Sequence, residues 1–498
     1  MPEFKKIASG LILLCLFTKL TAQDQKIVVH INESKQYQTI DNFAASDAWS
    51  CQFIGSWPEE KKSKIADWLF SSDTLQNGNP KGIGLSMWRY NLGAGSAEQN
   101  NDSKIKDEWR RAPLTINNNK KVQAQNWFLK AAKERGVKQF LGFYNSPPVT
   151  LTKNGHAFAD SGRTNIDPVK YKSFAQYTAQ AIKSIQQSTG VVFNYISPVN
   201  EPQWDWSDGG QEGCPYNNHE ISGLVKTFSE TFQQEKLPTK LLIAEAGQLN
   251  YLLPKSNKPD RDDQVNNFFN PTSSLYIGNL SAVSSTIASH SYFTTSPLAQ
   301  AIQMRTSVTD KISQVKGLGF WQSEYCILGD NAGEINGDKK DLGINAGLYV
   351  AKVIYEDLAF ANAAAWQWWT AISAYDYKDG LVYVDKSETD GSFSDSKMLW
   401  ALGNYSRFIR PGMKRVEVAF PETKGVLITA FKDPDTKQIV SVLVNENAES
   451  KTISFDQTAS TMGLILYTTS AADNLAKQIV TGKQFELPGK SVVTVLMK

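Results

Sequence analysis

The sequence predicts an α/β fold: a (β/α)8 TIM barrel with an appended antiparallel β-sandwich domain. Between about residues 40 and 405, short apolar runs alternate with longer amphipathic runs, the pattern of buried parallel strands joined by helices. Eight such apolar runs occur, which is the number that a closed barrel needs. After Pro411, β-rich segments separated by polar turns replace the alternation, as in a small β-sandwich.

The barrel strands are expected where the apolar runs fall. These runs cover residues 40–48, 83–91, 139–145, 195–200, 240–245, 287–292, 319–324 and 363–369. The helical runs between them cover residues 60–69, 124–134, 168–189, 221–235, 298–311 and 345–361. Asp167 and Pro168 suit the N-cap and first position of the third helix. An open doubly wound sheet is the alternative, but no G-x-G-x-x-G follows the first strand, which weighs against its dinucleotide-binding form.

Four segments divide the chain. Residues 1–22 are expected to be a signal peptide, 23–39 an N-terminal strand that joins the β-sandwich, 40–407 the catalytic barrel and 408–498 the sandwich. The strand at 26–31 would bring the two chain ends together. The sandwich strands are expected at 416–420, 426–432, 439–445, 452–455, 462–468 and 491–497.

The first 22 residues have the composition of a secretory leader. Lys5 and Lys6 precede an apolar run over 11–17, and a polar stretch ends at Ala22, after which cleavage is expected. Cys15 lacks the small residues that would precede a lipid-attachment cysteine. No later run reaches the ~18 apolar residues that a membrane span needs. We therefore expect a secreted or periplasmic protein, without a membrane span and monomeric.

Charge and metal-ligand content exclude several classes of partner. The formal net charge of +2 equals the leader's own, because Lys5, Lys6 and Lys19 against Glu3 give 3 − 1 = 2. A near-neutral mature chain without a basic stripe is not expected to bind nucleic acid, and a neutral polymer or a small neutral ligand is easier to accommodate. With 4 His and no C-x-x-C or H-E-x-x-H pattern, no metal site and no cofactor are expected. Export would allow one disulfide among Cys51, Cys214 and Cys326.

Two glutamates close opposite strands of the expected barrel. Glu201 ends the fourth strand in Asn-Glu-Pro, and Glu324 ends the seventh in Trp-Gln-Ser-Glu-Tyr. They are 324 − 201 = 123 residues apart, or three βα units of 41. Barrel enzymes carry their reactive groups at these strand ends. A protonated and an ionised carboxyl group are what glycoside hydrolysis needs, with retention if they lie about 5–5.5 Å apart.

With these motifs, the chain resembles glycoside hydrolase family 30 over nearly its whole length. The resemblance implies that Glu201 is the general acid/base and Glu324 the nucleophile. It further implies that Asn200 binds the sugar 2-hydroxyl and that Arg89 keeps Glu324 ionised. Asn145 lies in Asn-Ser-Pro-Pro, a turn similar to the family's.

Aromatic and polar residues at other strand ends are expected to bind substrate. Trp204 and Trp206 follow the acid/base in a polar loop, where core residues are unusual, and Trp49 follows the first strand. In the eighth strand, alternation puts Trp366 and Trp368 on one face and Trp369 on the other. A tryptophan here would form a floor for a sugar ring, and some of the three belong to the core. His290 could orient a carboxylate or a sugar hydroxyl, or could be a core residue. The full set of expected substrate-binding residues is Trp49, Arg89, Asn145, Asn200, Trp204, Trp206, His290, Tyr292, Trp366 and Trp368. Two further acids, Glu245 and Asp47, are expected to support the site or touch substrate.

The substrate is expected to be a polysaccharide or oligosaccharide. The segments 86–99, 109–112 and 211–214 look most like the endo-β-1,6-galactanases of the family, although residues 44–47 depart from its Gly-rich turn. A β-1,6-glucanase or xylanase of the same family is the alternative. A non-catalytic carbohydrate-binding protein is the alternative from another class, and it would not need both glutamates.

Overall fold

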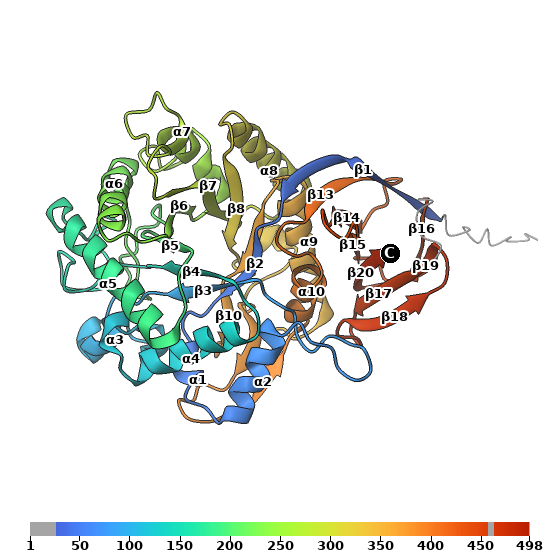
Figure 1. Ribbon diagram of the computed structural model, residues 1–498, viewed down its shortest axis with the longest axis horizontal. Coiled ribbons are helices and arrows are strands. Elements are labelled where there is room, and N and C mark those ends of the chain that lie inside the picture. The colour runs from blue at the N-terminus through green and yellow to red at the C-terminus, as the bar shows by residue number, and fades with distance from the viewer. Residues whose placement is uncertain (1–25, 457–462, 498) are drawn as a thin grey trace, which may run out of the picture.

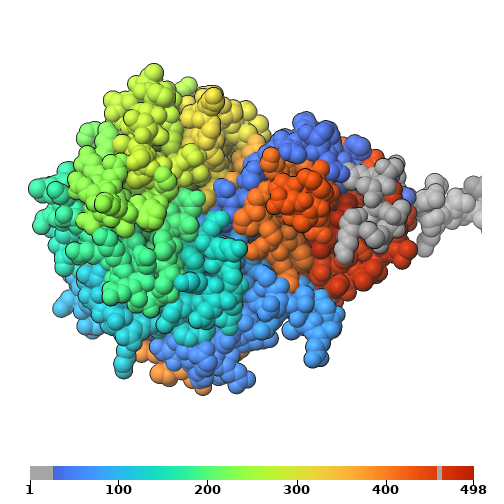
Figure 2. All heavy atoms as spheres, in the orientation of Figure 1, coloured from blue at the N-terminus to red at the C-terminus, as the bar shows by residue number. Residues whose placement is uncertain are grey.

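The computed structural model describes residues 26–456 and 463–497. It forms a large barrel unit and a smaller β unit beside it (Figure 1). In the space-filling view the chain's first described segment lies on the smaller unit, against its C-terminal part (Figure 2). The expected signal peptide, at 1–22, lies outside the described residues.

The barrel is closed by eight parallel strands. They are β2 (Asn42–Ser46), β3 (Met87–Asn91), β4 (Gln139–Phe143), β5 (Tyr195–Ser197), β6 (Lys240–Ala246), β7 (Val283–His290), β8 (Gly319–Glu324) and β9 (Ala365–Trp368). β2 pairs in parallel with both β3 and β9, which closes the ring. All eight predicted strands are confirmed. β7 begins four residues earlier than predicted. Ser284 and Thr286 are buried there, but these polar residues interrupt the apolar run from which the strand was predicted.

Helices follow the strands around the barrel (Figure 1). The α-helices are α1 (Cys51–Ile54), α2 (Glu59–Phe70), α3 (Ser96–Gln99), α4 (Lys120–Glu134), α5 (Tyr171–Thr189), α6 (Asn218–Gln234), α7 (Gln264–Phe269), α8 (Leu298–Ser313), α9 (Ile344–Ala359) and α10 (Lys397–Ser406). The short 3-10 helices are η1 (Asn100–Ser103), η2 (Glu108–Arg110), η3 (Thr115–Asn117), η4 (Pro168–Lys170), η5 (Leu249–Leu252) and η6 (Asn331–Gly333). The predicted cap is present: the Asp167 side chain accepts from the Val169 N–H at the start of η4, which leads into α5.

The second unit is a nine-stranded sheet folded on itself as a β-sandwich. Its order is β18-β17-β20-β15-β14-β13-β1-β16-β19. The strands are β1 (Ile27–Thr39), β13 (Lys414–Ala419), β14 (Val426–Lys432), β15 (Ile439–Asn445), β16 (Lys451–Phe455), β17 (Leu464–Thr469), β18 (Ala476–Val480), β19 (Gln484–Leu487) and β20 (Ser491–Met497). β1 pairs antiparallel with β13 and parallel with β16, with register shifts between Asn32 and Thr39 that bend it from one layer to the other.

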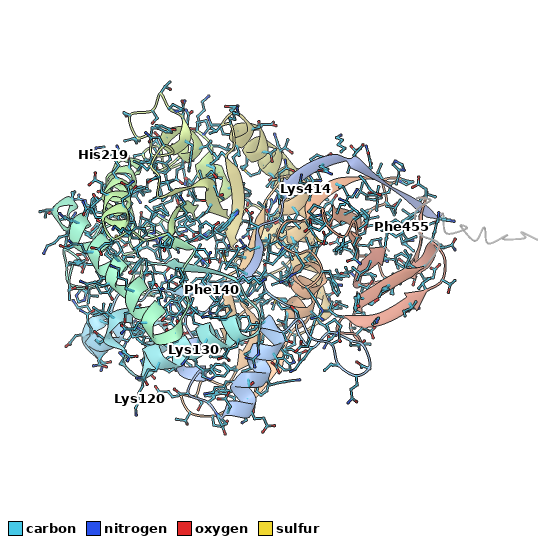
Figure 3. The ribbon with its side chains drawn as sticks, in the orientation of Figure 1. Lys120, Lys130, Phe140, His219, Lys414 and Phe455 are labelled. Atoms are coloured by element: carbon cyan, nitrogen blue, oxygen red, sulfur yellow. The ribbon has the colours of Figure 1, made fainter. Side chains whose placement is uncertain are left out.

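Helix α10 joins the two units, and a small separate sheet follows the last barrel strand. Asn404 of α10 donates to the Tyr467 carbonyl and to Thr494 of the sandwich, both at 2.9 Å. A separate sheet of β10 (Thr370–Ser373), β11 (Gly380–Val384) and β12 (Phe393–Asp395) extends the chain beyond β9. Figure 3 shows side chains filling both units, with Phe140 in the barrel and Phe455 in the sandwich. No helix in the described ranges is long and apolar enough to cross a membrane.

Candidate active site

A cavity of about 650 Å³ opens at the carboxyl ends of the barrel strands. Glu201 and Glu324 both line it, together with an unusual concentration of aromatic side chains. The lining residues are Trp49, Arg110, Asn200, Glu201, Trp204, Trp206, Gln211, Tyr292, Phe293, Glu324, Cys326, Leu328, Trp369, Tyr375, Asp376, Tyr377 and Asp379. The two glutamates that the sequence singled out therefore share one pocket.

Glu201 follows β5 in a left-handed backbone conformation (φ 46°). Its N–H donates to the Glu245 carbonyl at 2.8 Å, and its own carbonyl accepts from Trp206 Nε1 at 3.0 Å. These backbone bonds fix the turn that aims the side chain into the cavity. Burial raises the pKa of Glu201, and the negative charge of Glu324 adds to the rise, while His290 opposes both. The Glu201 carboxyl group is thus biased toward its protonated form.

Glu324 is the last residue of β8, and two donors hold its carboxylate. Arg89 Nη1 donates to Oε2, and the Tyr292 hydroxyl donates to Oε1 at 3.1 Å. Arg89 is fully buried, so the ion pair is screened little by water. A fixed cation and a hydroxyl donor both favour the ionised carboxylate. Glu324 is therefore paired with a buried cation, whereas Glu201 is biased toward its protonated form.

The two carboxyl groups lie close enough to act on one bond. One oxygen of Glu201, one oxygen of Glu324 and one ring nitrogen of His290 all lie within 4.8 Å of one another. Carboxyl groups about 5 Å apart are typical of retaining glycosidases, whereas inverting enzymes keep about 6.5–9.5 Å for a water. The separation of the pair therefore matches the retaining class.

His290 lies between two carboxylates beneath the cavity. Its Nδ1 is 2.9 Å from Glu201 Oε1, and its Nε2 is 3.1 Å from Glu245 Oε2. Although burial opposes the charge, the charge of Glu324 and the hydrogen bonds to Glu201 and Glu245 raise the pKa of His290 to about 10. The imidazolium therefore donates from both nitrogens. His290 does not line the cavity, so it orients a carboxylate rather than a sugar hydroxyl.

Glu201, His290 and Glu324 are also the one cluster in the described part of the chain whose atoms converge as metal ligands would. A metal needs a lone pair on a neutral imidazole nitrogen. Both His290 nitrogens already face carboxylates, and Arg89 supplies the positive charge at Glu324. The cluster fits a proton-handling site better than a cation site.

Glu245 ends the fifth barrel strand but does not reach the cavity. It is fully buried and accepts from Ser197 at 2.7 Å and from Ser323 at 2.6 Å. Burial works against its ionisation, but the charge of Arg89 and the hydrogen bond from His290 lower the pKa of Glu245 to about 2. It is a permanent anion that holds Arg89 and His290 in place.

Arg89, Asn200 and Asn145 form a chain of contacts from the barrel floor to the cavity. Arg89 Nη2 donates to Asn200 Oδ1 at 3.0 Å, and Asn200 Nδ2 donates to Asn145 Oδ1 at 3.1 Å. Asn200 lines the cavity, but Arg89 and Asn145 do not. The expectation that Arg89 and Asn145 contact substrate is therefore corrected: they position Glu324 and Asn200 from below.

Trp49, Trp204, Trp206 and Tyr292 all line the cavity, as expected from the sequence. Trp49 packs edge-on against Trp369 at 5.2 Å between ring centroids. Trp204 packs edge-on against Phe293 at 6.2 Å. The cavity therefore has one aromatic wall from the first and last barrel strands and another from the loops after β5 and β7.

The prediction for the eighth strand was wrong about which tryptophans face the cavity. Trp366 and Trp368 are fully buried, and their indole N–H groups donate to Asp357 of α9 at 2.9 Å and to the Asp379 carbonyl at 2.6 Å. Between them Gln367 points into the barrel and donates to Asn42 Oδ1 at 3.1 Å. The inward face is therefore the one that carries Trp369. The alternation was right, but its direction was reversed.

Several lining residues were not singled out by the sequence. Arg110 lies in the segment 109–112, for which the sequence predicts no binding role. Residues 375–379 and Phe293 lie in loops, where no periodicity indicates the direction of a side chain. The short strands β10 and β11, which bring Asp379 to the cavity, follow directly after the expected barrel end. Polar and aromatic residues just beyond the eighth strand were the available signal.

Asp47 and the cysteines belong to the framework. Asp47 accepts from the Asn91 N–H at 2.7 Å and from Gln125 at 2.9 Å, and it does not line the cavity. Cys51, Cys214 and Cys326 are buried free thiols, so the disulfide that export would allow is not formed. The Tyr292 hydroxyl lies 3.8 Å from Cys326 Sγ, and both residues belong to the cavity wall.

Comparison with known structures finds proteins that are similar over nearly the whole chain. The chain is similar to a conserved exported protein from Bacteroides fragilis, with 33% identity, a TM-score of 0.87, and 94% of this chain and 100% of that chain covered. The catalytic domain of a xylanase from Talaromyces cellulolyticus has 22% identity and a TM-score of 0.68 over 95% and 100% of the two chains. An endo-β-1,6-glucanase has 16% identity and a TM-score of 0.66 over 94% of each chain. The last two comparisons show a shared fold alone.

The family models agree with the division of the structure into two units. Residues 25–383 match the model described as O-Glycosyl hydrolase family 30, which covers β1 and the whole barrel. Residues 412–495 match the model of the glycosyl hydrolase family 30 β-sandwich domain. With both units matched and two carboxyl groups facing each other in the barrel, the chain belongs to glycoside hydrolase family 30.

Proposed function

We propose that this protein is an exported retaining glycoside hydrolase that cleaves β-1,6-galactan through a covalent glycosyl-enzyme intermediate. The observation that carries the mechanism is the pair of carboxyl oxygens, on Glu201 and Glu324, within 4.8 Å of each other. Their surroundings differ in the direction that two separate roles require: Glu201 is buried beside an anion, and Glu324 is bonded to Arg89.

In the first step, the Glu324 carboxylate attacks the anomeric carbon and Glu201 gives its proton to the departing glycosidic oxygen. The carbon–oxygen bond of the glycoside breaks as the bond to Glu324 forms. In the second step, Glu201, now ionised, takes a proton from a water that attacks the same carbon, and Glu324 leaves as a carboxylate. In the intermediate Glu324 carries no charge, so one of the causes that raise the pKa of Glu201 is removed. The resulting lower pKa suits the change of Glu201 from acid to base.

The polar contacts around the pair support both steps. Arg89 and Tyr292 stabilise the Glu324 carboxylate before attack and on departure. The His290 imidazolium keeps Glu201 Oε1 in place at 2.9 Å and stabilises the charge that Glu201 acquires after it gives up its proton. Asn200 presents its amide to the cavity and is fixed by Arg89 and Asn145. These contacts hold the reacting groups before substrate arrives.

The galactan specificity rests on sequence resemblance. The segments 86–99, 109–112 and 211–214 resemble those of the endo-β-1,6-galactanases, and the last two reach the cavity through Arg110 and Gln211. Export rests on the leader-like composition of residues 1–22. A β-1,6-glucanase or a xylanase would use the same two glutamates, so product analysis must separate the three.

The test is hydrolysis of three polymers by the mature protein: de-arabinosylated arabinogalactan, β-1,6-glucan and glucuronoxylan. We expect galacto-oligosaccharides from the first, whose newly formed reducing ends are β anomers when followed by proton NMR. Glu201→Gln and Glu324→Gln should each lose at least about 10³-fold in kcat. The control is Glu212→Gln, because Glu212 is an equally buried carboxyl group bonded to Ser96 outside the cavity.

Each part of the proposal has its own contrary result. Products from glucan or xylan alone would reject galactan and keep the mechanism. A first-formed α anomer would reject retention. Binding of oligosaccharide without hydrolysis, unchanged in Glu324→Gln, would favour a carbohydrate-binding protein.

A further inference from the structure

One part of the cavity has no role in the mechanism above. Arg110, Tyr375 and Asp379 line it on the side of Trp49 and Trp369, away from the wall that Trp204 and Phe293 form. Arg110 closes η2 after the second barrel strand, and Asp379 directly precedes β11. Two oppositely charged side chains from distant segments thus meet the same cavity as the reacting pair.

Asp379 is a buried carboxyl group whose hydrogen bonding is incomplete. It is 8% exposed, and its Oδ1 has no hydrogen-bond partner. Burial raises the pKa of Asp379 to about 6, against the opposing effects of Ser373 and the Arg110 charge. Its backbone is fixed, because Trp368 Nε1 donates to the Asp379 carbonyl at 2.6 Å. Buried polar atoms are nearly always paired, so the Asp379 carboxyl group, which lines the cavity, has one acceptor for which the described residues supply no donor.

Arg110 is held in place by aromatic rings rather than by a carboxylate. Its guanidinium lies 5.4 Å from the centroid of the Trp49 ring and 5.0 Å from that of Tyr375. Within the described ranges it forms no ion pair, and its Nε has no hydrogen-bond partner. Stacking fixes the plane of a guanidinium without using its hydrogen-bond donors. Arg110 therefore lies against the Trp49 ring, on which a sugar could stack.

The charges around the cavity select the kind of sugar. Four carboxyl groups line it, on Glu201, Glu324, Asp376 and Asp379, against the one cation of Arg110. A uronate would bring a further negative charge next to these groups without a second cation in the lining. A neutral ring offers hydroxyl groups that both donate to Asp379 and accept from Arg110. The charge balance thus favours a neutral sugar over an acidic one.

We propose that Arg110 and Asp379 form a hydroxyl-binding subsite for a neutral hexopyranose unit, with the sugar face against the Trp49–Trp369 wall. This inference rests on the proposed function and adds which unit the cavity accepts: one whose hydroxyl groups at this wall are unsubstituted. Hydroxyl recognition by buried polar groups discriminates strongly, because an analogue that lacks the hydroxyl leaves those groups unpaired.

The subsite is tested by binding in the Glu324→Gln protein, which keeps the cavity and should not turn over. The probe is β-1,6-galactotetraose, measured by isothermal titration calorimetry. We expect Asp379→Asn and Arg110→Met each to weaken binding at least about 10-fold. The matched control is Asp385→Asn, a carboxyl group that is exposed outside the cavity and accepts from the Ser392 N–H at 2.8 Å. It should change the affinity less than about 2-fold.

A second probe, tetraose with a terminal glucuronate, tests the charge argument. We expect it to bind more weakly than the neutral probe, because its carboxylate would lie among the carboxyl groups that line the cavity. Unchanged affinity for the neutral probe in both variants, or no binding to the Glu324→Gln parent, would overturn the proposal. So would a loss in Arg110→Met confined to the acidic probe. If Asp379→Asn does not fold, as judged by thermal melting, Arg110→Met decides alone. Failure of the proposed function appears separately, as missing hydrolysis by the wild-type protein.

Discussion

Two fully buried clusters of charged residues lie on either side of the barrel wall. One lies inside the strands and joins Arg89, Glu245 and His290. The other lies outside, between α8 and α9, where Arg305 Nε donates to Asp357 Oδ1 at 2.8 Å and Arg305 Nη1 is 3.5 Å from Glu356. Each has a fully buried arginine between two acids. Burial and charge pairing alone do not distinguish them.

The difference is whether the cluster opens to solvent space. The inner cluster contacts Glu201 and Glu324, which line a cavity of about 650 Å³. The outer cluster ends on the Trp366 indole and the Ser291 hydroxyl, both buried. Yet Glu356 of the outer cluster has a pKa that burial raises to about 8. A perturbed pKa therefore indicates function only when a ligand can reach the group.

The largest effect that separates the clusters is expected from matched arginine replacements. Arg89→Lys keeps a cation but cannot bond Glu324 and Asn200 together, as the guanidinium does. We expect kcat/KM to fall about 10²-fold or more. Arg305→Lys should leave kcat/KM within about 2-fold and lower the melting temperature instead. Equal losses of activity in the two variants, at equal melting temperatures, would contradict the distinction.

A smaller effect is expected from Glu245→Gln, within the inner cluster. The amide retains the shape of Glu245 but removes the anion that supports the charge of His290. The pKa of His290 then falls, and its positive charge no longer lowers the pKa of Glu201 as strongly. We expect kcat to fall about 10-fold and the alkaline limb of the pH profile of kcat/KM to move to higher pH.

The control for this pH shift is Glu212→Gln, which replaces a buried carboxyl group whose pKa burial raises to about 7. Glu212 bonds Ser96 and the Ala94 N–H, not His290. Its alkaline limb should match that of the wild type. An unmoved limb in Glu245→Gln would show that Glu245 has a structural role alone.

The barrel could be predicted from sequence because its strands are short and apolar throughout. Buried parallel strands read as continuous apolar runs, and β8 was predicted at both of its ends. β18 and β19 were missed because half or more of their residues are exposed and most of those exposed residues are polar. Such edge strands are defined by their partners, β17 and β16, rather than by their own composition.

The reacting pair could be predicted for a similar reason. Glu201 and Glu324 each come at the end of an apolar run, and the barrel brings such ends together. The side from which Trp369 enters the cavity could not be predicted, because a run buried on both faces gives no inward direction. The subsite residues Arg110 and Asp379 lie in the connections that follow barrel strands, whose paths are set by contacts with the rest of the fold.

The smallest effect is expected from Glu356→Gln in the outer cluster, and it concerns stability. Neither carboxyl oxygen of Glu356 accepts a hydrogen bond. Since its folded pKa of about 8 lies above the ordinary value of 4.5, the folded state holds this proton more tightly than the unfolded state. The contribution of Glu356 to stability is therefore full below pH 4.5 and is lost as the pH rises through about 8.

Because the amide stays neutral, Glu356→Gln should melt about 2–4 °C above wild type at pH 9 and close to wild type at pH 5. Scanning calorimetry at the two pH values measures this difference. Glu230→Gln, which replaces an exposed carboxylate of α6, should leave it unchanged. Activity at pH 5 should also be unchanged, since Glu356 contacts no cavity-lining residue. A pH-independent loss of stability in Glu356→Gln would mean that the outer cluster needs the ionised carboxylate, and that Arg305 pairs with both acids rather than with Asp357 alone.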